Sequence, residues 1–170
     1  MDNVVSVPPA ERWFEDYHPG MVSEFGEYQV TQQEIVAFAS RYDPQAMHTD
    51  PAAAAQGPFG GLIASGWHTA AMMMRMYADN FVSKVAALAA PGIDELRWVR
   101  PVRPGDTLRM RVTVVEARRS ASKPDRGVLR NFAEVLNQKG EVVMSLRPIN
   151  FVRCRPTDQP ASAAVASRSA

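Results

Sequence analysis

The sequence predicts an α+β domain in which an antiparallel sheet of about five strands wraps around one long buried helix. Two observations predict it. Drawn as a helix, residues 65–89 are apolar on nearly every side, whereas a surface helix carries a polar face. After Pro91-Gly92 the spacing of the apolar residues changes from the helical period of about 3.6 to the strand period of about 2.

Composition describes an ordinary globular chain. Its 170 residues suffice for one domain with a sizeable core, and a net charge of +1 gives no footprint for nucleic acid or a membrane surface. A single cysteine, Cys154, excludes an internal disulfide and a cysteine-based zinc site, and we expect it to be inert. The N-terminus lacks the basic start and apolar run of a signal peptide, and no apolar run is long enough to cross a bilayer. We therefore expect a cytoplasmic protein.

The first elements can be placed from local signals. Residues 1–20 are expected to form an irregular arm, and residues 25–30 have strand character. Thr31 and Glu34 form a capping box, which predicts a helix over residues 32–42. Pro44 disfavours helical geometry at the residue before it, so the helix should end there. Asp50-Pro51 is typical of an N-cap and first helical residue, and predicts a short helical turn that ends at Gly57.

The second half of the chain is predicted to be the buried helix and most of the sheet. The helix should run over residues 65–89 and end at Pro91-Gly92. A meander of four strands should follow, at residues 93–100, 107–118, 128–136 and 141–153, with a turn at 101–106 between the first two. The domain is therefore predicted to span residues 21–154. Residues 155–170 are rich in Ala, Ser and Pro, which predicts a disordered tail.

An acid and an imidazole, Asp43 and His48, lie five residues apart in a segment that cannot be one helix. A Gly-rich turn leads from them to the start of the buried helix at Ser65 and Gly66. Such groups near a helix N-terminus can move protons beside an oxygen that gains negative charge. We predict that Asp43 activates a water, that His48 positions it and delivers a proton, and that the Gly66 N–H stabilises the oxyanion. The reverse division of roles between the pair stays open.

Four segments carry a family resemblance. Asp43-x4-His48-x-Asp50, Phe-Gly-Gly-Leu-Ile-Ala-Ser-Gly at 59–66, Leu-Arg-Trp at 96–98 and Pro-Val-Arg-Pro-Gly-Asp-Thr-Leu at 101–108 resemble the MaoC-type acyl dehydratases. These are (R)-specific enoyl-thioester hydratases of the hotdog fold, and the resemblance covers residues 22–153. Two positions depart from the family. Residues 44–47 read Pro-Gln-Ala-Met where the family commonly has Asn-Pro, and Ser65 stands where it commonly has His.

This resemblance implies a hydro-lyase that reversibly hydrates a 2-enoyl thioester to a 3-hydroxyacyl thioester. It implies no metal and no redox cofactor, because coenzyme A or an acyl carrier belongs to the substrate. It also implies a homodimer or a higher homo-oligomer, with both protomers of a dimer lining each tunnel. The residues expected to bind the acyl thioester are Met47, Phe59, Gly61, Ile63, Ser65 and Trp67.

Several of these residues also have plain structural explanations. Asp50 is expected to be only an N-cap, and His48-x-Asp50 lacks the further ligands of a metal site. His68, one turn inside the buried helix, is expected to be a packed, hydrogen-bonded core histidine. Ser65 is not expected to be a nucleophile, because the sequence places no base beside it.

Two groups keep alternatives open. The methionines of the buried helix are expected mostly in the core, although flexible thioethers also suit an acyl tunnel; they are Met72, Met73, Met74 and Met76. Three arginines form either a solvated face or a contact with the phosphates of a coenzyme A or carrier-protein thioester; they are Arg97, Arg100 and Arg103.

Two other functions remain open at this level. One is a thioesterase of the same fold, in which a carboxylate activates water against the carbonyl carbon. The other is a non-catalytic acyl-thioester binder or structural subunit of a larger assembly. Retention of both Asp43 and His48 argues against the binder.

Overall fold

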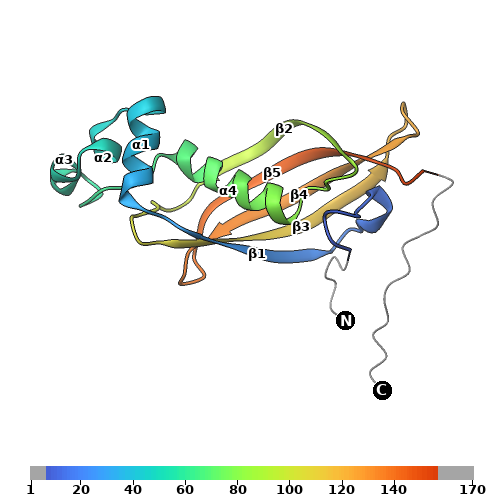
Figure 1. The fold of residues 1–170 in the computed structure, drawn as a ribbon, viewed down its shortest axis with the longest axis horizontal. Helices are drawn as coiled ribbons and strands as arrows, with labels where there is room; N and C mark the ends of the chain where they lie inside the picture. The colour runs from blue at the N-terminus through green and yellow to red at the C-terminus, as the bar shows by residue number, and fades with distance from the viewer. Residues whose placement is uncertain (1–6, 157–170) are drawn as a thin grey trace, which may run out of the picture.

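The computed structural model, which describes residues 7–156, is a five-stranded antiparallel sheet curved around helix α4 (Figure 1). The predicted α+β fold is confirmed. The strands are β1 (Val22–Gln29), β2 (Ala87–Trp98), β3 (Thr107–Arg119), β4 (Arg126–Leu136) and β5 (Val142–Arg153), in the spatial order β1-β3-β4-β5-β2. The helices are η1 (Phe14–Asp16), α1 (Gln32–Tyr42), α2 (Ala46–Thr49), α3 (Pro51–Gln56) and α4 (Gly66–Asn80).

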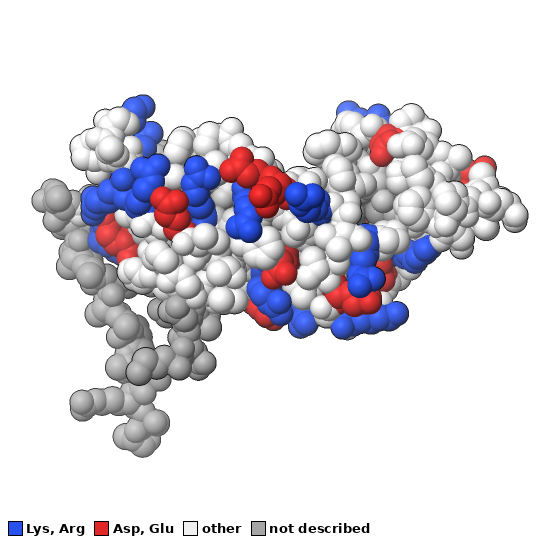
Figure 2. Space-filling model, turned by 180° about the vertical axis from the view of Figure 1, so that it is seen from behind, with Lys and Arg blue, Asp and Glu red and all other residues white. Residues whose placement is uncertain are grey.

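The core lies between α4 and the inner face of the sheet. Alternation along β3 buries four apolar side chains completely, as the period of 2 predicts: Leu108, Met110, Val112 and Val114. Helix α4 covers this face with three buried methionines, Met72, Met73 and Met76. The opposite face is polar, with rows of basic and acidic side chains (Figure 2) that form pairs such as Arg111 with Glu24 at 2.6 Å. This division fixes which way the sheet curves around the helix.

The predicted extent of the buried helix is wrong. Helix α4 ends at Asn80, and residues 87–98 form β2. The chain turns because Phe81 packs into the core, where its ring stacks on Tyr77 at 5.1 Å, and because the Ser83 hydroxyl accepts a hydrogen bond from the Ala86 N–H at 2.8 Å. Pro91 lies inside an edge strand, where the missing N–H costs no essential ladder bond.

The predicted four-strand meander is also wrong in its first connection, the one between β2 and β3. Strands β3, β4 and β5 are consecutive neighbours, but β2 pairs with β5 at the edge of the sheet and never meets β3. Residues 99–106 therefore cross to the other side of the molecule instead of forming a hairpin. Buried Val102 anchors this crossing, and its carbonyl accepts from the Ala64 N–H at 2.8 Å. The crossing segment thus lies beside the chain that leads into α4.

Helices α1, α2 and α3 cluster at one end of the sheet, beside the N-terminus of α4, whereas η1 lies at the opposite end (Figure 1). The predicted capping box is present, since Thr31 Oγ accepts from the Glu34 N–H at 3.2 Å. The Asp50 carboxylate accepts from the N–H groups of Ala52 and Ala53, so its predicted N-cap role is confirmed. These local caps fix where the short helices begin, and with them the segment that carries Asp43 and His48.

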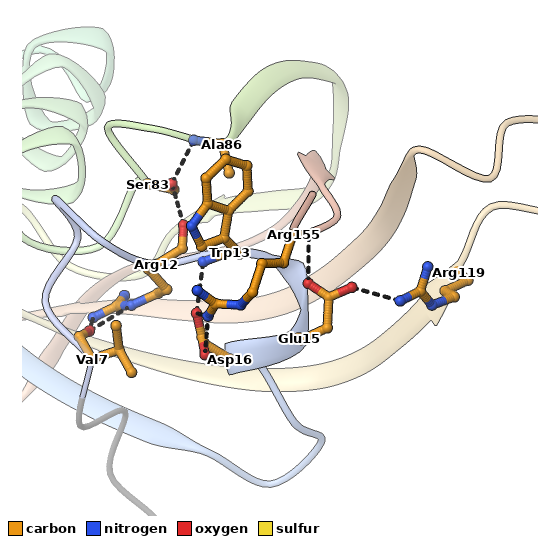
Figure 3. A network of polar contacts seen from close by, with 9 residues as sticks. All are labelled: Val7, Arg12, Trp13, Glu15, Asp16, Ser83, Ala86, Arg119 and Arg155. Carbon is orange, nitrogen blue, oxygen red and sulfur yellow. Dashed lines mark hydrogen bonds and ion pairs between the residues drawn. The ribbon is translucent and has the colours of Figure 1, made fainter. Parts of the chain in front are cut away.

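The N-terminal arm is held by a cluster of ion pairs and hydrogen bonds (Figure 3), which we call the clasp; its charged members are Arg12, Glu15, Asp16, Arg119 and Arg155. Both Asp16 carboxylate oxygens accept from Arg155 Nη2, at 3.0 and 2.9 Å. Buried Arg12 donates to the carbonyls of Val7 and Phe81. The clasp ties the arm to the end of β5 and to the turn after α4. Most of the tail predicted at 155–170 lies outside the described residues.

Candidate active site

Asp43 is the residue at which α1 ends, and its backbone N–H donates to the Ala39 carbonyl at 2.9 Å. Gln45 Nε2 donates to Asp43 Oδ1 at 2.7 Å, and the Ser65 hydroxyl donates to Oδ2 at 2.7 Å. Hydrogen bonds to a carboxylate favour its charged form. The Gln45 bond, and after it the Ser65 bond, hold the pKa of Asp43 below its usual range. Asp43 is therefore an ionised and firmly oriented carboxylate at neutral pH.

His48 lies on α2 and is buried, with its ring turned toward Asp43. Its Nδ1 is 2.9 Å from the Ile63 carbonyl oxygen. Because a carbonyl only accepts, Nδ1 carries a proton, and in its neutral form such a ring presents the lone pair of Nε2. That Nε2 is 3.5 Å from Asp43 Oδ2. Two acceptors in this arrangement suit a single water that directs one hydrogen to each.

The start of α4 lies beside this pair. The Ser65 hydroxyl caps the helix by accepting from the Trp67 N–H at 3.2 Å while it donates to Asp43. Ser65 is fully buried, and both hydrogen-bonding roles of its hydroxyl are occupied, which suits a positioning residue and not a nucleophile. Within residues 7–156 the Gly66 N–H has no hydrogen-bond partner. It lies at the positive end of a 15-residue helix, where a developing anion is stabilised.

A pocket of about 300 Å³ opens between α2, the first turn of α4 and the crossing segment. Five residues singled out from the sequence line it: Met47, His48, Phe59, Ile63 and Gly66. Others come from chain that sequence reasoning did not assign to the site, among them Thr69, Trp98 and Val99, and they are joined by Arg100, one of the three arginines considered for a phosphate contact. The Leu-Arg-Trp motif at 96–98 was a signal for Trp98, but nothing local indicates that β2 brings its end to α4.

Three residues expected to bind substrate lie away from the pocket lining. Ser65 is buried and donates its hydrogen bond to Asp43, as described above. Gly61 has φ 154° and faces the Arg103 guanidinium. Trp67 is largely exposed, with its ring edge-on to Trp98 at 5.3 Å between centroids. Of these three, Ser65 is the one that contacts Asp43, through its hydroxyl.

His68 is packed as expected but is not hydrogen-bonded as expected. Its ring stacks on Phe38 at 4.8 Å, and within the described part of the chain its buried Nδ1 has no partner. Burial lowers the pKa of His68, with Glu34 opposing this effect. The ring is therefore held neutral.

The surrounding arginines separate into different roles. Arg100 borders the pocket and has a long contact of 3.9 Å to Glu141, whereas Arg103 donates to the Phe59 carbonyl at 2.6 Å. Among residues 7–156 no group of three or more His, Cys, Asp or Glu side chains is arranged to hold a metal ion. No helix of this same part is long and apolar enough to span a membrane.

Comparison with known proteins identifies the family. A family model described as the MaoC like domain matches residues 16–135. The chain belongs to the MaoC-like family. A MaoC-like dehydratase from Rhodospirillum rubrum has a TM-score of 0.80 at 38% identity, over 85% of this chain and 99% of that one. A Mycobacterium tuberculosis protein described as a double hotdog fold has a TM-score of 0.71 at 17% identity, over 95% of this chain and 53% of that one, so the predicted hotdog fold is confirmed.

Two curated relatives also match the chain, and the name of one of them states a function. An uncharacterized Bacillus subtilis protein, YdeM, is 28% identical over 125 residues, which are 74% of this chain and 87% of that protein. A protein from Mycobacterium tuberculosis named 3-hydroxyacyl-thioester dehydratase Z is 36% identical over 88 residues, which are 51% of this chain and 58% of that one. The family therefore includes hydratases and dehydratases of acyl thioesters.

Proposed function

We propose that this MaoC-like protein is a hydro-lyase that reversibly adds water to a 2-enoyl thioester and forms a 3-hydroxyacyl thioester. The observation that carries the proposal is the facing pair, Asp43 Oδ2 and His48 Nε2 at 3.5 Å, of which His48 lines a pocket that also reaches Gly66. The relative named 3-hydroxyacyl-thioester dehydratase supports the same reaction class.

In the proposed mechanism, one water lies between Asp43 and His48 and attacks C3 of the enoyl chain. The Gly66 N–H and the α4 dipole stabilise the negative charge that moves to the thioester oxygen. The water loses a proton as the C3–O bond forms, and a proton is then added at C2. Coenzyme A or an acyl carrier enters only as part of the substrate, and no metal or redox cofactor takes part in these steps.

The structure favours a division of roles that was left open by the sequence. Asp43 has a lowered pKa, so it is a weak base, and an imidazole is intrinsically the stronger base of the two. We therefore assign His48 Nε2 to accept the proton of water and deliver it to C2. Asp43 orients the water and stabilises the transient imidazolium. This keeps the predicted proton delivery by His48 and moves the activation of water from Asp43 to His48.

The test is a panel of enoyl-CoA esters of graded length and branching, followed by ultraviolet absorbance and by a thiol reagent. Hydration removes the absorbance of the conjugated enoyl group and leaves the thioester intact. Release of free thiol without loss of the double bond identifies the thioesterase alternative. Binding without either change identifies the non-catalytic alternative.

We also propose a homodimer, with β2 in its interface. Strand β2 is an edge of the sheet, and exposed apolar side chains flank it; they are Met74, Ile93, Trp98 and Val99. An open edge beside apolar surface is seldom left uncovered in a stable protein. Light scattering should give twice the chain mass of 18.7 kDa, and a monomer independent of concentration would contradict the dimer.

A further inference from the structure

Trp98, the last residue of β2, lies directly on Gly66. Its indole Nε1 donates a hydrogen bond to the Gly66 carbonyl at 2.8 Å. A Cβ placed on Gly66 would overlap the indole ring, so glycine at this position allows the close approach of Trp98.

A β-bulge aims Trp98 at the helix. The pairing of β2 with β5 shifts register between Asp94 and Arg97, and Glu95 between them has φ 52°. Among residues 7–156, Glu95 is the only residue other than glycine with a positive φ. Its carboxylate is paired with Arg147 at 3.0 Å. Bulges re-aim side chains next to functional sites, and here the strand regains its register just before Trp98.

We propose that Trp98 is a positioning and specificity-determining residue of the site. Its N–H holds the Gly66 carbonyl and its ring packs on Gly66, so together they restrict the backbone rotation of the residue that carries the oxyanion N–H. The same ring forms the pocket wall beside that donor. When the thioester oxygen is bound at the Gly66 N–H, the carbonyl carbon lies beside Gly66. C2 is bonded to that carbon and therefore lies next to the indole. Trp98 therefore selects 2-enoyl thioesters that are unbranched at C2. This inference rests on the proposed hydration at the same site.

The test compares crotonyl-CoA with its 2-methyl homologue, tigloyl-CoA, in three forms of the full chain. The wild type should prefer the unbranched ester by roughly tenfold or more in kcat/KM, the range for one methyl group in a shaped pocket. Trp98→Ala should remove most of that preference, because loss of the N–H slows the reaction of both esters while loss of the ring relieves only tigloyl-CoA. Trp98→Phe, which keeps a ring and loses the N–H, should keep the preference and lower kcat by roughly tenfold at similar KM.

A matched control is Trp13→Phe, the same change at the N-cap of η1, which should alter neither kcat nor the preference. An unchanged preference in folded Trp98→Ala overturns the specificity role. Wild-type kcat in Trp98→Phe overturns the positioning role. If the wild type hydrates no enoyl-CoA at all, the proposed function falls and this inference falls with it. If the wild type hydrates enoyl-CoA esters and Trp98→Ala has the same preference as the wild type, the specificity role of Trp98 is wrong and the proposed function still stands.

A double-mutant cycle tests the contact with Gly66 itself. Gly66→Ala should lower turnover by roughly 10²-fold in the wild type, the range for a disturbed oxyanion donor. In the Trp98→Ala background the same change should cost at least tenfold less, because the added methyl no longer meets the indole. Equal losses in the two backgrounds would show that the glycine serves the thioester and not Trp98.

Discussion

The polar groups near the two ends of helix α4 differ in whether their hydrogen bonds are satisfied. At the C-terminal end, the clasp pairs Asp16 with Arg155 through both carboxylate oxygens, and Arg12 is bonded to backbone carbonyls (Figure 3). At the N-terminal end, Asp43 Oδ2 and His48 Nε2 are too far apart for a good hydrogen bond. The Gly66 N–H also lacks a partner within the described residues.

This difference in hydrogen bonding indicates that the clasp contributes to stability and that the N-terminal end of α4 contributes to function. A buried polar group that is fully hydrogen-bonded holds elements together, and each unpaired one needs a further explanation. The clasp needs none, because its groups satisfy one another. The groups beside Gly66 retain hydrogen-bonding capacity that a water and a thioester would use. Substitutions at the clasp should therefore change stability, and substitutions at the other end should change rate.

The largest effect is expected at the acid–base pair. His48→Ala and Asp43→Ala should each lower turnover by roughly 10²–10⁴-fold, the usual contribution of a positioned acid or base. Because the two act as a unit, the double variant should be scarcely slower than the slower single one. Rates are measured on the best enoyl-CoA, with Asp50→Asn as the acidic control that keeps its helix cap. Full activity in a folded single variant would refute the assignment.

The clasp should show the reverse behaviour. Asp16→Ala leaves the Arg155 guanidinium without its carboxylate, and both side chains are mostly buried. We expect a loss of about 2–3 kcal/mol in the free energy of unfolding, measured in urea, with unchanged turnover. Asp79→Ala, which breaks the exposed pair with Arg75, should cost less than about 0.5 kcal/mol. An Asp16→Ala protein with lowered turnover and unchanged stability would contradict the assignment of the clasp to stability.

A smaller effect on turnover is expected when one of the hydrogen bonds that orient Asp43 is removed. Ser65→Ala should lower turnover by roughly tenfold, because Asp43 loses one of the bonds that orient it. That bond lowers the pKa of Asp43, so its removal raises the pKa, and activity should disappear at a higher pH as the solution is acidified. Gln45→Ala should move the acid limb of the pH–rate profile at least as far. An unmoved acid limb in both variants would mean that the protonation of another group, and not of Asp43, limits the rate at low pH.

The smallest effect is expected at His68. Its burial lowers the pKa, so the unfolded chain binds a proton near pH 6.5 that the folded chain does not, and stability falls as pH drops through that region. His68→Phe keeps the stacking on Phe38 and removes this sensitivity. We expect stability at pH 7 to change by less than about 1 kcal/mol, with a relative gain at pH 5. Lost turnover with unchanged stability would instead place His68 in the substrate site.

Local signals in the sequence determined much of this protein. The bounds of α1 follow from the Thr31 capping box and from Pro44, and Asp50 was identified as an N-cap because caps involve only neighbouring residues. The pairing of Asp43 with His48 was also predictable, since both belong to one short segment. The inner face of β3 followed from its period of 2.

Tertiary structure decided what depended on distant partners. The apolar run after Asn80 became strand and not helix because β5 offers it a hydrogen-bonded edge, which no local pattern encodes. The Ser65 hydroxyl meets Asp43 across 22 positions of chain, and Trp98 meets Gly66 across 32, through a bulge that only strand pairing creates. Sequence periodicity reports which face of an element is apolar. Which element that face meets is decided by packing, and in this protein packing completes the site.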